Sequence, residues 1–234
     1  MTTDHAGSTA ITRARHEVCD LHGALVDNNL VAWTSGNISA RVPGAGPGGA
    51  DMMVIKPSGV AYPDLTPGSM VLCDLDGHAV EDGLSPSSDT ATHAYVYRHM
   101  PDVGGVVHTH STYATAWAAR GEAVPCVITA MADEFGGGIP LGPFALIGSD
   151  DIGRGIVSTL TGHRSPAVLM RSHGVFTIGR TARDAVKTAV MCEDVARTVH
   201  LAQAYGELTP LARDQVDALH RRYTQEYGQR PKGM

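Results

Sequence analysis

The connections between predicted strands change in kind along this chain, and this change constrains the fold more than any other sequence feature. The strand pattern of 33–42, interrupted by a small polar turn, is joined to that of 52–55 only by the Gly/Pro-rich segment 43–50. A connection of this kind is typical of a hairpin. Later strands alternate with segments of helical periodicity such as 112–120 and 181–204. The mixture predicts an α/β/α or α+β layered domain with a mixed or antiparallel sheet.

The remaining segments complete this prediction. Apolar spacing predicts further helices over 11–30, from the serines at 87–88 to Met100, and over 211–223, and further strands over 71–74, 125–129 and 167–170. No G-x-G-x-x-G stands between a strand and a helix, which disfavours a dinucleotide-binding fold. We expect one domain over 1–234, with frayed residues at 1–10 and a C-terminal tail at 224–234.

Composition excludes several classes of protein. The 234 residues are 43% hydrophobic and 18% charged, which is enough apolar material for one large core. A net charge of -6 gives no reason to expect nucleic acid or an anionic membrane as a partner. Four cysteines without a C-x-x-C pair are typical of reduced thiols. With no apolar run of signal-peptide or membrane-span type, we expect a cytoplasmic protein.

A pair of histidines closes the apolar run 103–107. Side chains alternate along a strand, so His108 and His110 point the same way, with Cβ atoms about 7 Å apart in a fully extended strand. Imidazole is the commonest metal ligand, and neutral nitrogen suits zinc and its neighbours. The alternative is that both histidines merely line the end of a strand.

His173 is the natural third ligand, because it ends the apolar strand 167–170 and precedes Gly174. Three protein ligands with an open position indicate a catalytic metal site. Asp89 follows two serines, where it either caps a helix or serves as a fourth ligand or acid/base group. Most other histidines, including His22, are expected on helix surfaces. For His93 we expect solvent exposure, with a place behind the ligands as the alternative.

Small polar residues recur at turns. Hydroxyls and free N–H groups at such turns can hold an anion, and a nearby lysine adds a positive charge. Each turn alone is an ordinary turn, but several around one metal motif predict a phosphorylated small-molecule substrate. The candidates are Ser35, Gly36, Asn37, Lys56, Ser58, Gly59, Ser87 and Ser88.

Together these stretches resemble the class II aldolase/adducin-like family, with coverage from about Trp33 to the C-terminus. The matching segments are Thr34-Ser-Gly-Asn-Ile-Ser-Ala40, Ile55-Lys-Pro-Ser-Gly-Val60, Pro86-Ser-Ser-Asp-Thr90, Gly104-Gly-Val-Val-His-Thr-His-Ser111 and Arg171-Ser-His-Gly174. The resemblance implies a single three-layer α/β/α domain with a central, largely antiparallel or mixed sheet. It implies one divalent ion per subunit, expected to be zinc, on His108, His110 and His173, with Asp89 on or beside the ion. It also implies a homotetramer with sites between subunits.

Within the family the chain is most similar to the epimerase branch, which converts L-ribulose 5-phosphate into D-xylulose 5-phosphate. Thr129 and Asp133 match the Thr-x-x-x-Asp pair of that branch, and Tyr227 matches its terminal Tyr-Gly-Gln. The resemblance implies that Thr129 contacts the substrate and that Asp133 and Tyr227 are catalytic, alongside Asp89. Tyr227 would act on the substrate of a neighbouring subunit. The expected chemistry is cleavage of the C3–C4 bond, rotation of the retained aldehyde and re-formation of the bond.

Two departures from the epimerase pattern leave an aldolase as an alternative function. Met131-Ala132-Asp133-Glu134 stands where the branch has His-Ala-Asp-Tyr, and 141–145 reads Leu-Gly-Pro-Phe-Ala, closer to fuculose-phosphate aldolases. The alternative is therefore cleavage of a ketose 1-phosphate to dihydroxyacetone phosphate and an aldehyde. Against it, the aldolase branch has Glu at the position of Asp89 and lacks the acid matching Asp133. A non-catalytic adducin-like interaction module is a remote alternative, because it would be expected to lose the histidines.

Overall fold

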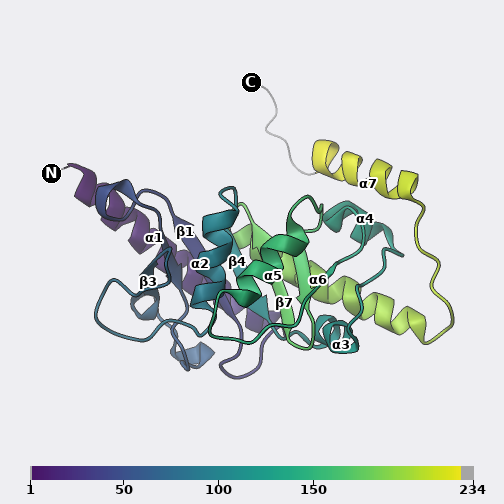
Figure 1. The fold of residues 1–234 in the computed structure, drawn as a ribbon, viewed down its shortest axis with the longest axis horizontal. Helices are drawn as coiled ribbons and strands as arrows, with labels where there is room; N and C mark the ends of the chain where they lie inside the picture. Colours follow the sequence, from purple (N-terminus) through teal and green to yellow (C-terminus); the bar gives the residue numbers. More distant parts are fainter. Residues whose placement is uncertain (1, 228–234) are drawn as a thin grey trace.

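The computed structural model describes residues 2–227, with side chains from Gly7 onward, and a seven-stranded sheet forms its centre (Figure 1). All neighbouring strands are antiparallel except β5 and β6, which are parallel. This confirms the predicted central, largely antiparallel and mixed sheet. The strands run in the order β3 (Val71–Asp74), β2 (Met52–Ile55), β1 (Asn37–Val42), β4 (Gly105–Thr109), β7 (Gly174–Gly179), β6 (Ala167–Met170) and β5 (Leu141–Gly142).

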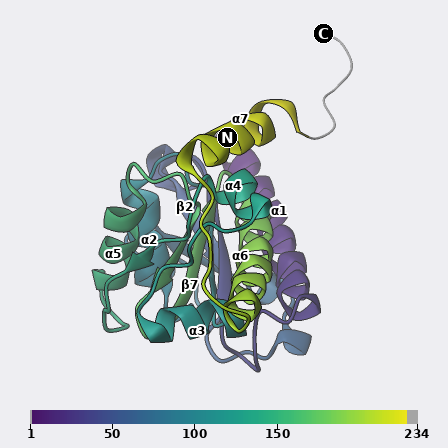
Figure 2. The same cartoon turned by 90° about the vertical axis from the view of Figure 1, so that its right-hand side faces the viewer.

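Helices cover both faces of the sheet. Helices α1 (Thr2–Asp27) and α6 (Ala182–Gln203) lie on one face, and α2 (Thr90–His99) and α5 (Asp151–Leu160) lie on the other (Figure 2). The alternation along β4 places Val107 in the core under α1 and α6, whereas Val106 packs with α2 and α5. The three-layer α/β/α architecture is therefore confirmed.

The remaining helices lie at the end of the sheet that β5, β6 and β7 occupy. Helices α3 (Thr112–Arg120) and α4 (Thr129–Phe135) pack with α6 around a third apolar core. Helix α7 (Arg213–Glu226) lies across α4 at the periphery (Figures 1 and 2). Short 3₁₀ turns occupy 47–49, 62–64 and 67–69.

Several predicted boundaries were wrong. Helix α1 spans Thr2–Asp27, whereas the sequence predicted a helix over 11–30. Extending an existing helix is easier than nucleating one, which favours this longer element. Thr129 begins α4, whereas the sequence predicted a strand over 125–129. Val124, the residue before that segment, forms an isolated antiparallel bridge with Ile139. Strand β7 was missed, because its short apolar run lies directly behind the histidine turn.

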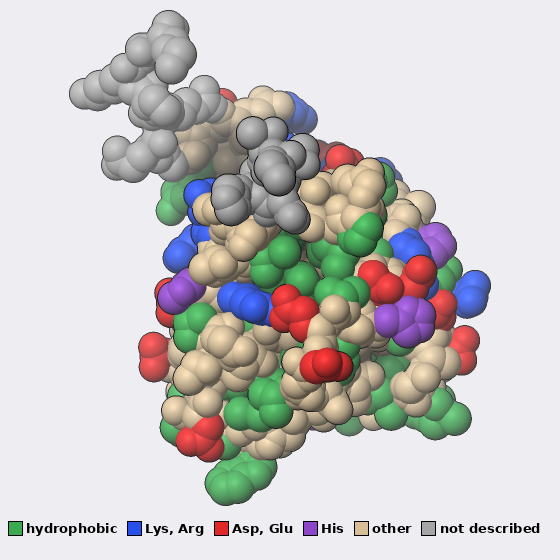
Figure 3. Space-filling view, turned by 90° about the vertical axis from the view of Figure 1, so that its left-hand side faces the viewer, with side chains coloured by type: hydrophobic (Ala, Val, Ile, Leu, Met, Phe, Trp, Pro, Cys, Tyr) green, Lys and Arg blue, Asp and Glu red, His purple; other side chains and the backbone are tan. Residues whose placement is uncertain are grey.

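The surface shows no single dominant charge on the face that carries β3 and the start of α1, where acidic and basic side chains are interspersed (Figure 3). Among the described residues, no helix is long and apolar enough to cross a membrane. All four cysteines are free, and two of them are buried.

Candidate metal centre and phosphate pocket

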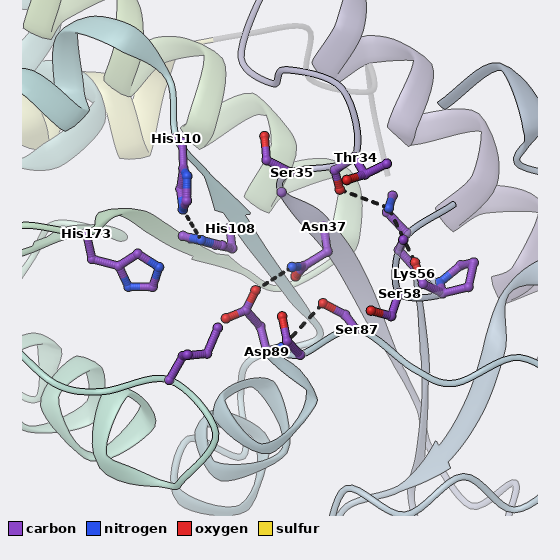
Figure 4. A pocket seen from close by; sticks show the side chains of 15 residues that line it. Thr34, Ser35, Asn37, Lys56, Ser58, Ser87, Asp89, His108, His110 and His173 are labelled. Atoms are coloured by element: carbon purple, nitrogen blue, oxygen red, sulfur yellow. Dashed lines mark hydrogen bonds between the residues drawn. The ribbon is translucent and has the colours of Figure 1, made fainter. Parts of the chain in front are cut away.

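Strand β4 and the turn between β6 and β7 bring three imidazoles together. One ring nitrogen each of His108, His110 and His173 lies within 4.8 Å of the others. The Nε2 atoms of His108 and His110 are 2.9 Å apart. His108 is buried, His173 is half-buried and His110 is exposed. The predicted pair and the predicted third histidine therefore converge on one point at the edge of the sheet (Figure 4).

Neighbouring strands orient the His108 ring. Phe176 on β7 pairs with His108 in the sheet, and the two rings stack with centroids 4.1 Å apart. The Nδ1 atom of His108 donates to the carbonyl of Val175 at 2.9 Å, which leaves Nε2 as the free acceptor. Burial lowers the pKa of His108 to about 3, so the ring is neutral at physiological pH. A neutral, oriented imidazole is the form that binds a metal ion.

The turn that carries His173 depends on a missing side chain. A Cβ atom at Gly174 would lie 2.6 Å from the carbonyl oxygen of Thr109 and 2.8 Å from the His110 ring. Ser172 adopts a left-handed conformation with φ of 56°, which turns the chain back toward β7. Glycine after His173 therefore allows the close approach of the three rings.

Asp89 lies at the start of α2 but does not cap it through its side chain. Its Oδ2 accepts a 2.7 Å hydrogen bond from the Asn37 amide, and its Oδ1 is buried without a partner among the described residues. Burial raises the pKa of this carboxyl, but nearby His108 and His93 and the Asn37 amide outweigh it, so the pKa lies below its usual range. A buried carboxylate oxygen without a partner, beside three imidazole nitrogens, is a donor set that suits a divalent ion.

The histidines form one end of a cavity of about 300 Å³. Two paired turns form the other end: Ser58 N–H donates to Ser85 O at 2.9 Å, and Ser87 N–H donates to Lys56 O at 3.0 Å. Asn37 and Asp89 lie between the two ends (Figure 4). All predicted phosphate ligands except Thr129 line this cavity: Gly36, Asn37, Lys56, Ser58, Gly59, Ser87 and Ser88.

Lys56 is almost fully buried at the end of the cavity opposite the histidines. Its Nζ donates to the carbonyls of Thr34 and Pro57 at 3.2 and 3.3 Å, and burial lowers its pKa. The turn before β1 is fixed further by Tyr62, whose hydroxyl donates to Ser35 O at 2.8 Å. Lys56 therefore both holds this turn and offers an ammonium group to the cavity.

The other predicted catalytic residues lie elsewhere on the same chain. Asp133 and Tyr227 line a second cavity of about 540 Å³ that shares no lining residue with the first. Thr129 is exposed at the start of α4. Gly228 and Gln229, which complete the terminal motif, lie outside the described residues. Within one chain, Asp133 and Tyr227 therefore lie apart from the three histidines. The roles predicted for Asp133, Tyr227 and Thr129 stay predictions.

Sequence reasoning missed some residues of the site. Thr34, Pro57 and Ile147 also line the first cavity. His93 was expected in solvent, but it is fully buried, and its Nδ1 lies 2.7 Å from the Ser39 hydroxyl. Its position four residues after Asp89, on the same side of α2, is the signal that could have placed it behind the site.

His22 was also expected on the surface and is buried. Its Nδ1 donates to Val18 O at 2.6 Å, and its Nε2 accepts the Ile38 N–H at 3.1 Å. Local periodicity placed His22 on α1 but did not show that the N–H group of β1 needs an acceptor there.

The chain is similar in sequence to a known protein family and to named relatives. The family model described as class II aldolase and adducin N-terminal domain matches residues 16–200. A Salmonella paratyphi C protein named L-ribulose-5-phosphate 4-epimerase UlaF is 42% identical over 200 residues, which cover 82% of this chain and 86% of that protein. A protein of the same name from Salmonella typhi shows the same identity and coverage.

Two solved structures share the fold. One, described as L-fuculose 1-phosphate aldolase, has a TM-score of 0.81 at 24% identity and covers 91% of this chain and 96% of its own. The other, the enzyme of that name from Glaciozyma antarctica PI12, has a TM-score of 0.74 at 18% identity, with coverages of 90% and 81%. At these identities the likeness concerns the fold alone.

Proposed function

This chain belongs to the class II aldolase and adducin N-terminal domain family, and we propose that it is a metal-dependent enzyme that converts L-ribulose 5-phosphate into D-xylulose 5-phosphate. The observation that carries this proposal is the 42% identity, over 82% of the chain, to a relative named L-ribulose-5-phosphate 4-epimerase. Incubation of the purified protein with L-ribulose 5-phosphate, followed by detection of D-xylulose 5-phosphate, tests it directly.

The family uses a divalent metal, and we assign zinc to the three histidines with Asp89 on or beside the ion. Three imidazole ligands with an open position are the usual surroundings of a catalytic zinc ion. The buried, unpartnered Oδ1 of Asp89 supports this assignment. When bound, the ion supplies Lewis-acid stabilisation of the negative charge that develops on substrate oxygens as the C3–C4 bond breaks.

The chain itself must hold the substrate phosphate. The turns of Ser58 and Ser87, together with Lys56, line the end of the cavity opposite the histidines. Serine hydroxyls beside an ammonium group suit a phosphate dianion. A firmly held phosphate keeps the aldehyde fragment in place, which separates epimerisation from release of two products. Thr129 is proposed as a further substrate contact.

Asp133 and Tyr227 are proposed to move protons at the C4 oxygen. Inversion at C4 requires that the bond break on one face of the aldehyde and re-form on the other. The C4 hydroxyl loses its proton on the first face, and the new hydroxyl gains one on the opposite face. A carboxyl and a phenol approaching from two sides provide these two groups.

Since Asp133 and Tyr227 lie in the second cavity, we propose that a second copy of the chain brings them to the first. Apolar side chains beside the histidine cavity support such an interface: Phe144, Leu146 and Ile147 are 58%, 72% and 54% exposed. The proposed assembly is a homotetramer with sites between subunits. The expected cytoplasmic location stays a prediction.

A ketose 1-phosphate aldolase is the second candidate. The TM-score of 0.81 to L-fuculose 1-phosphate aldolase and the segment Leu141–Ala145 keep it in view. An adducin-like module without catalysis is disfavoured, because three histidines converge on one point.

A further inference from the structure

A second cluster of titratable side chains joins three helices far from the histidines. Glu134 on α4 accepts hydrogen bonds from Tyr223 on α7, at 2.5 Å to Oε2, and from Lys187 on α6, at 2.9 Å to the same atom. Lys187 Nζ also lies 2.8 Å from Oε1 of Glu134 and 2.8 Å from the Tyr223 hydroxyl. The Glu134 side chain is only 9% exposed. We call these three residues the carboxylate clamp.

The charge of Glu134 makes this clamp energetically important. A carboxylate withdrawn from water needs both an opposite charge and hydrogen-bond donors, and here Lys187 and Tyr223 supply them. Burial alone lowers the pKa of Lys187, but its hydrogen bonds to Glu134 and Tyr223 outweigh this effect and raise it. The ammonium group therefore stays charged, and removal of either donor would leave Glu134 poorly satisfied.

Helix α7 depends on such polar contacts for its position. Among its residues only Val216 is buried, so apolar packing contributes little to its docking. Polar contacts join it to α4: Tyr223 donates to Glu134, His220 Nδ1 donates to the backbone oxygen of Asp133 at 3.0 Å, and the Arg222 guanidinium lies 3.9 Å from the Asp133 carboxylate. A few hydrogen bonds therefore set the position of this peripheral helix.

The clamp continues to Tyr227. Tyr223 lies one helical turn before it, and the two rings stack with centroids 4.8 Å apart and planes 23° apart. One end of the Tyr223 ring is fixed by Glu134, and its face supports the otherwise exposed ring of Tyr227. Asp133, beside Glu134 on α4, lines the same cavity.

We propose that the carboxylate clamp is a positioning device that docks α7 onto α4 and sets the place of the Tyr227 phenol relative to the Asp133 carboxylate. Its role in turnover rests on the proposed function, whereas its role in docking α7 does not. Glu134 stands where the epimerase pattern has Tyr, so this chain uses its own arrangement for the purpose.

Amide hydrogen exchange of α7 tests the docking. Tyr223→Phe removes the donated hydrogen bond but keeps the stacked ring, and it should raise exchange of α7 amides by about tenfold. Glu134→Ala should raise it further, whereas Glu134→Gln keeps an acceptor and should restore most of the protection. Tyr205→Phe is the matched control, since Tyr205 is 93% exposed. Unchanged exchange in Tyr223→Phe and Glu134→Ala would overturn the proposal.

A double-mutant cycle tests whether the clamp acts through Tyr227. Tyr223→Phe should lower kcat for L-ribulose 5-phosphate by about tenfold, with KM and metal content unchanged. In a Tyr227→Phe background the same change should have no further effect. An equal loss in both backgrounds would mean that Tyr223 does not act through Tyr227. If the wild-type protein does not epimerise this sugar, the proposed function fails, and hydrogen exchange alone decides the clamp.

Discussion

The Asn37 amide donates a 2.7 Å hydrogen bond to Oδ2 of Asp89, and this bond joins the two halves of the cavity. Asn37 lies at the start of β1 beside His108, whereas Asp89 lies at the start of α2. The bond leaves the other oxygen of Asp89 free toward the histidines. It therefore connects β1, which follows the proposed phosphate-binding turn, to the carboxylate beside the three histidines.

Asn37→Ala should weaken the site without unfolding the protein. The buried Asp89 carboxylate would lose the only hydrogen-bond donor to its side chain among the described residues, and bonds to charged groups are worth about 1.5–3 kcal/mol. We therefore expect about a 10- to 100-fold lower kcat/KM. Steady-state kinetics with zinc titration measures this. Asn28→Ala, at an exposed amide directly after α1, is the control. Full activity and unchanged zinc affinity in Asn37→Ala would contradict the role of the bond.

Metal removal should abolish activity while the fold persists. The three histidines lie at the sheet edge, and the apolar cores do not depend on an ion between them. His110→Asn, or treatment of the wild type with a chelator, should reduce bound zinc from one per chain toward none, with an unchanged circular dichroism spectrum. His78→Asn, at an exposed position, should keep its metal. A metal-free wild type with full activity would end the metal assignment.

Asp133→Asn and Tyr227→Phe should each lower the rate of epimerisation by about 10²- to 10⁴-fold, the range of general acid–base effects. Metal content should stay at the wild-type level, because both residues lie in the second cavity. Metal analysis alongside kcat measures both. Normal turnover in the two variants would remove them from the mechanism.

Mixed oligomers extend this prediction to the proposed interface. His110→Asn and Tyr227→Phe chains are each expected to be inactive alone. If sites lie between subunits, refolding the two together should create sites that combine the intact histidines of one chain with the intact tyrosine of another. Activity should then return in part. Two inactive variants that stay inactive in confirmed mixed oligomers would contradict a shared site.

The buried imidazole of His22 should make the free energy of unfolding depend on pH. Burial lowers its pKa from 6.5 to about 3, so between these values the unfolded state binds more protons than the folded state. The free energy of unfolding should therefore fall as pH drops through this window, by up to about 1.4 kcal/mol per pH unit from this group. Protonation would also remove the acceptor for the Ile38 N–H.

Urea unfolding at several pH values measures this slope. His22→Gln should be less stable at pH 7 but should show a shallower loss of stability below pH 6.5. His78→Gln, at an exposed position, should keep the wild-type slope. A wild-type slope in His22→Gln would contradict the assignment.

The metal site was predictable because its information is local. The His108 and His110 spacing follows from the two-residue repeat of a strand, and Gly174 marks the turn that His173 needs. The burial of His93 and the separation of Asp133 from the histidines depend on how helices pack over the sheet. Helical spacing puts His93 on the same side of α2 as Asp89, but it does not show that this side packs against the sheet, so His93 was predicted in solvent.

In the fold, too, the features set by local patterns were predicted, and those set by tertiary packing were missed. Patterns of alternation and helical spacing predicted the layers and most elements, because apolar faces must be buried against each other. The segment 125–129 was predicted as a strand, yet Thr129 begins α4. Tertiary packing of Met131 and Phe135 in the core overrides the local preference there.

Parallel assays of L-ribulose 5-phosphate and L-fuculose 1-phosphate, with the same zinc-loaded protein, test the central claim most directly. If the protein is the proposed epimerase, it should form D-xylulose 5-phosphate from the first sugar without release of free aldehyde, and it should turn over the second sugar only slightly. Rapid formation of dihydroxyacetone phosphate and an aldehyde from the second sugar, with no epimerisation of the first, would contradict it.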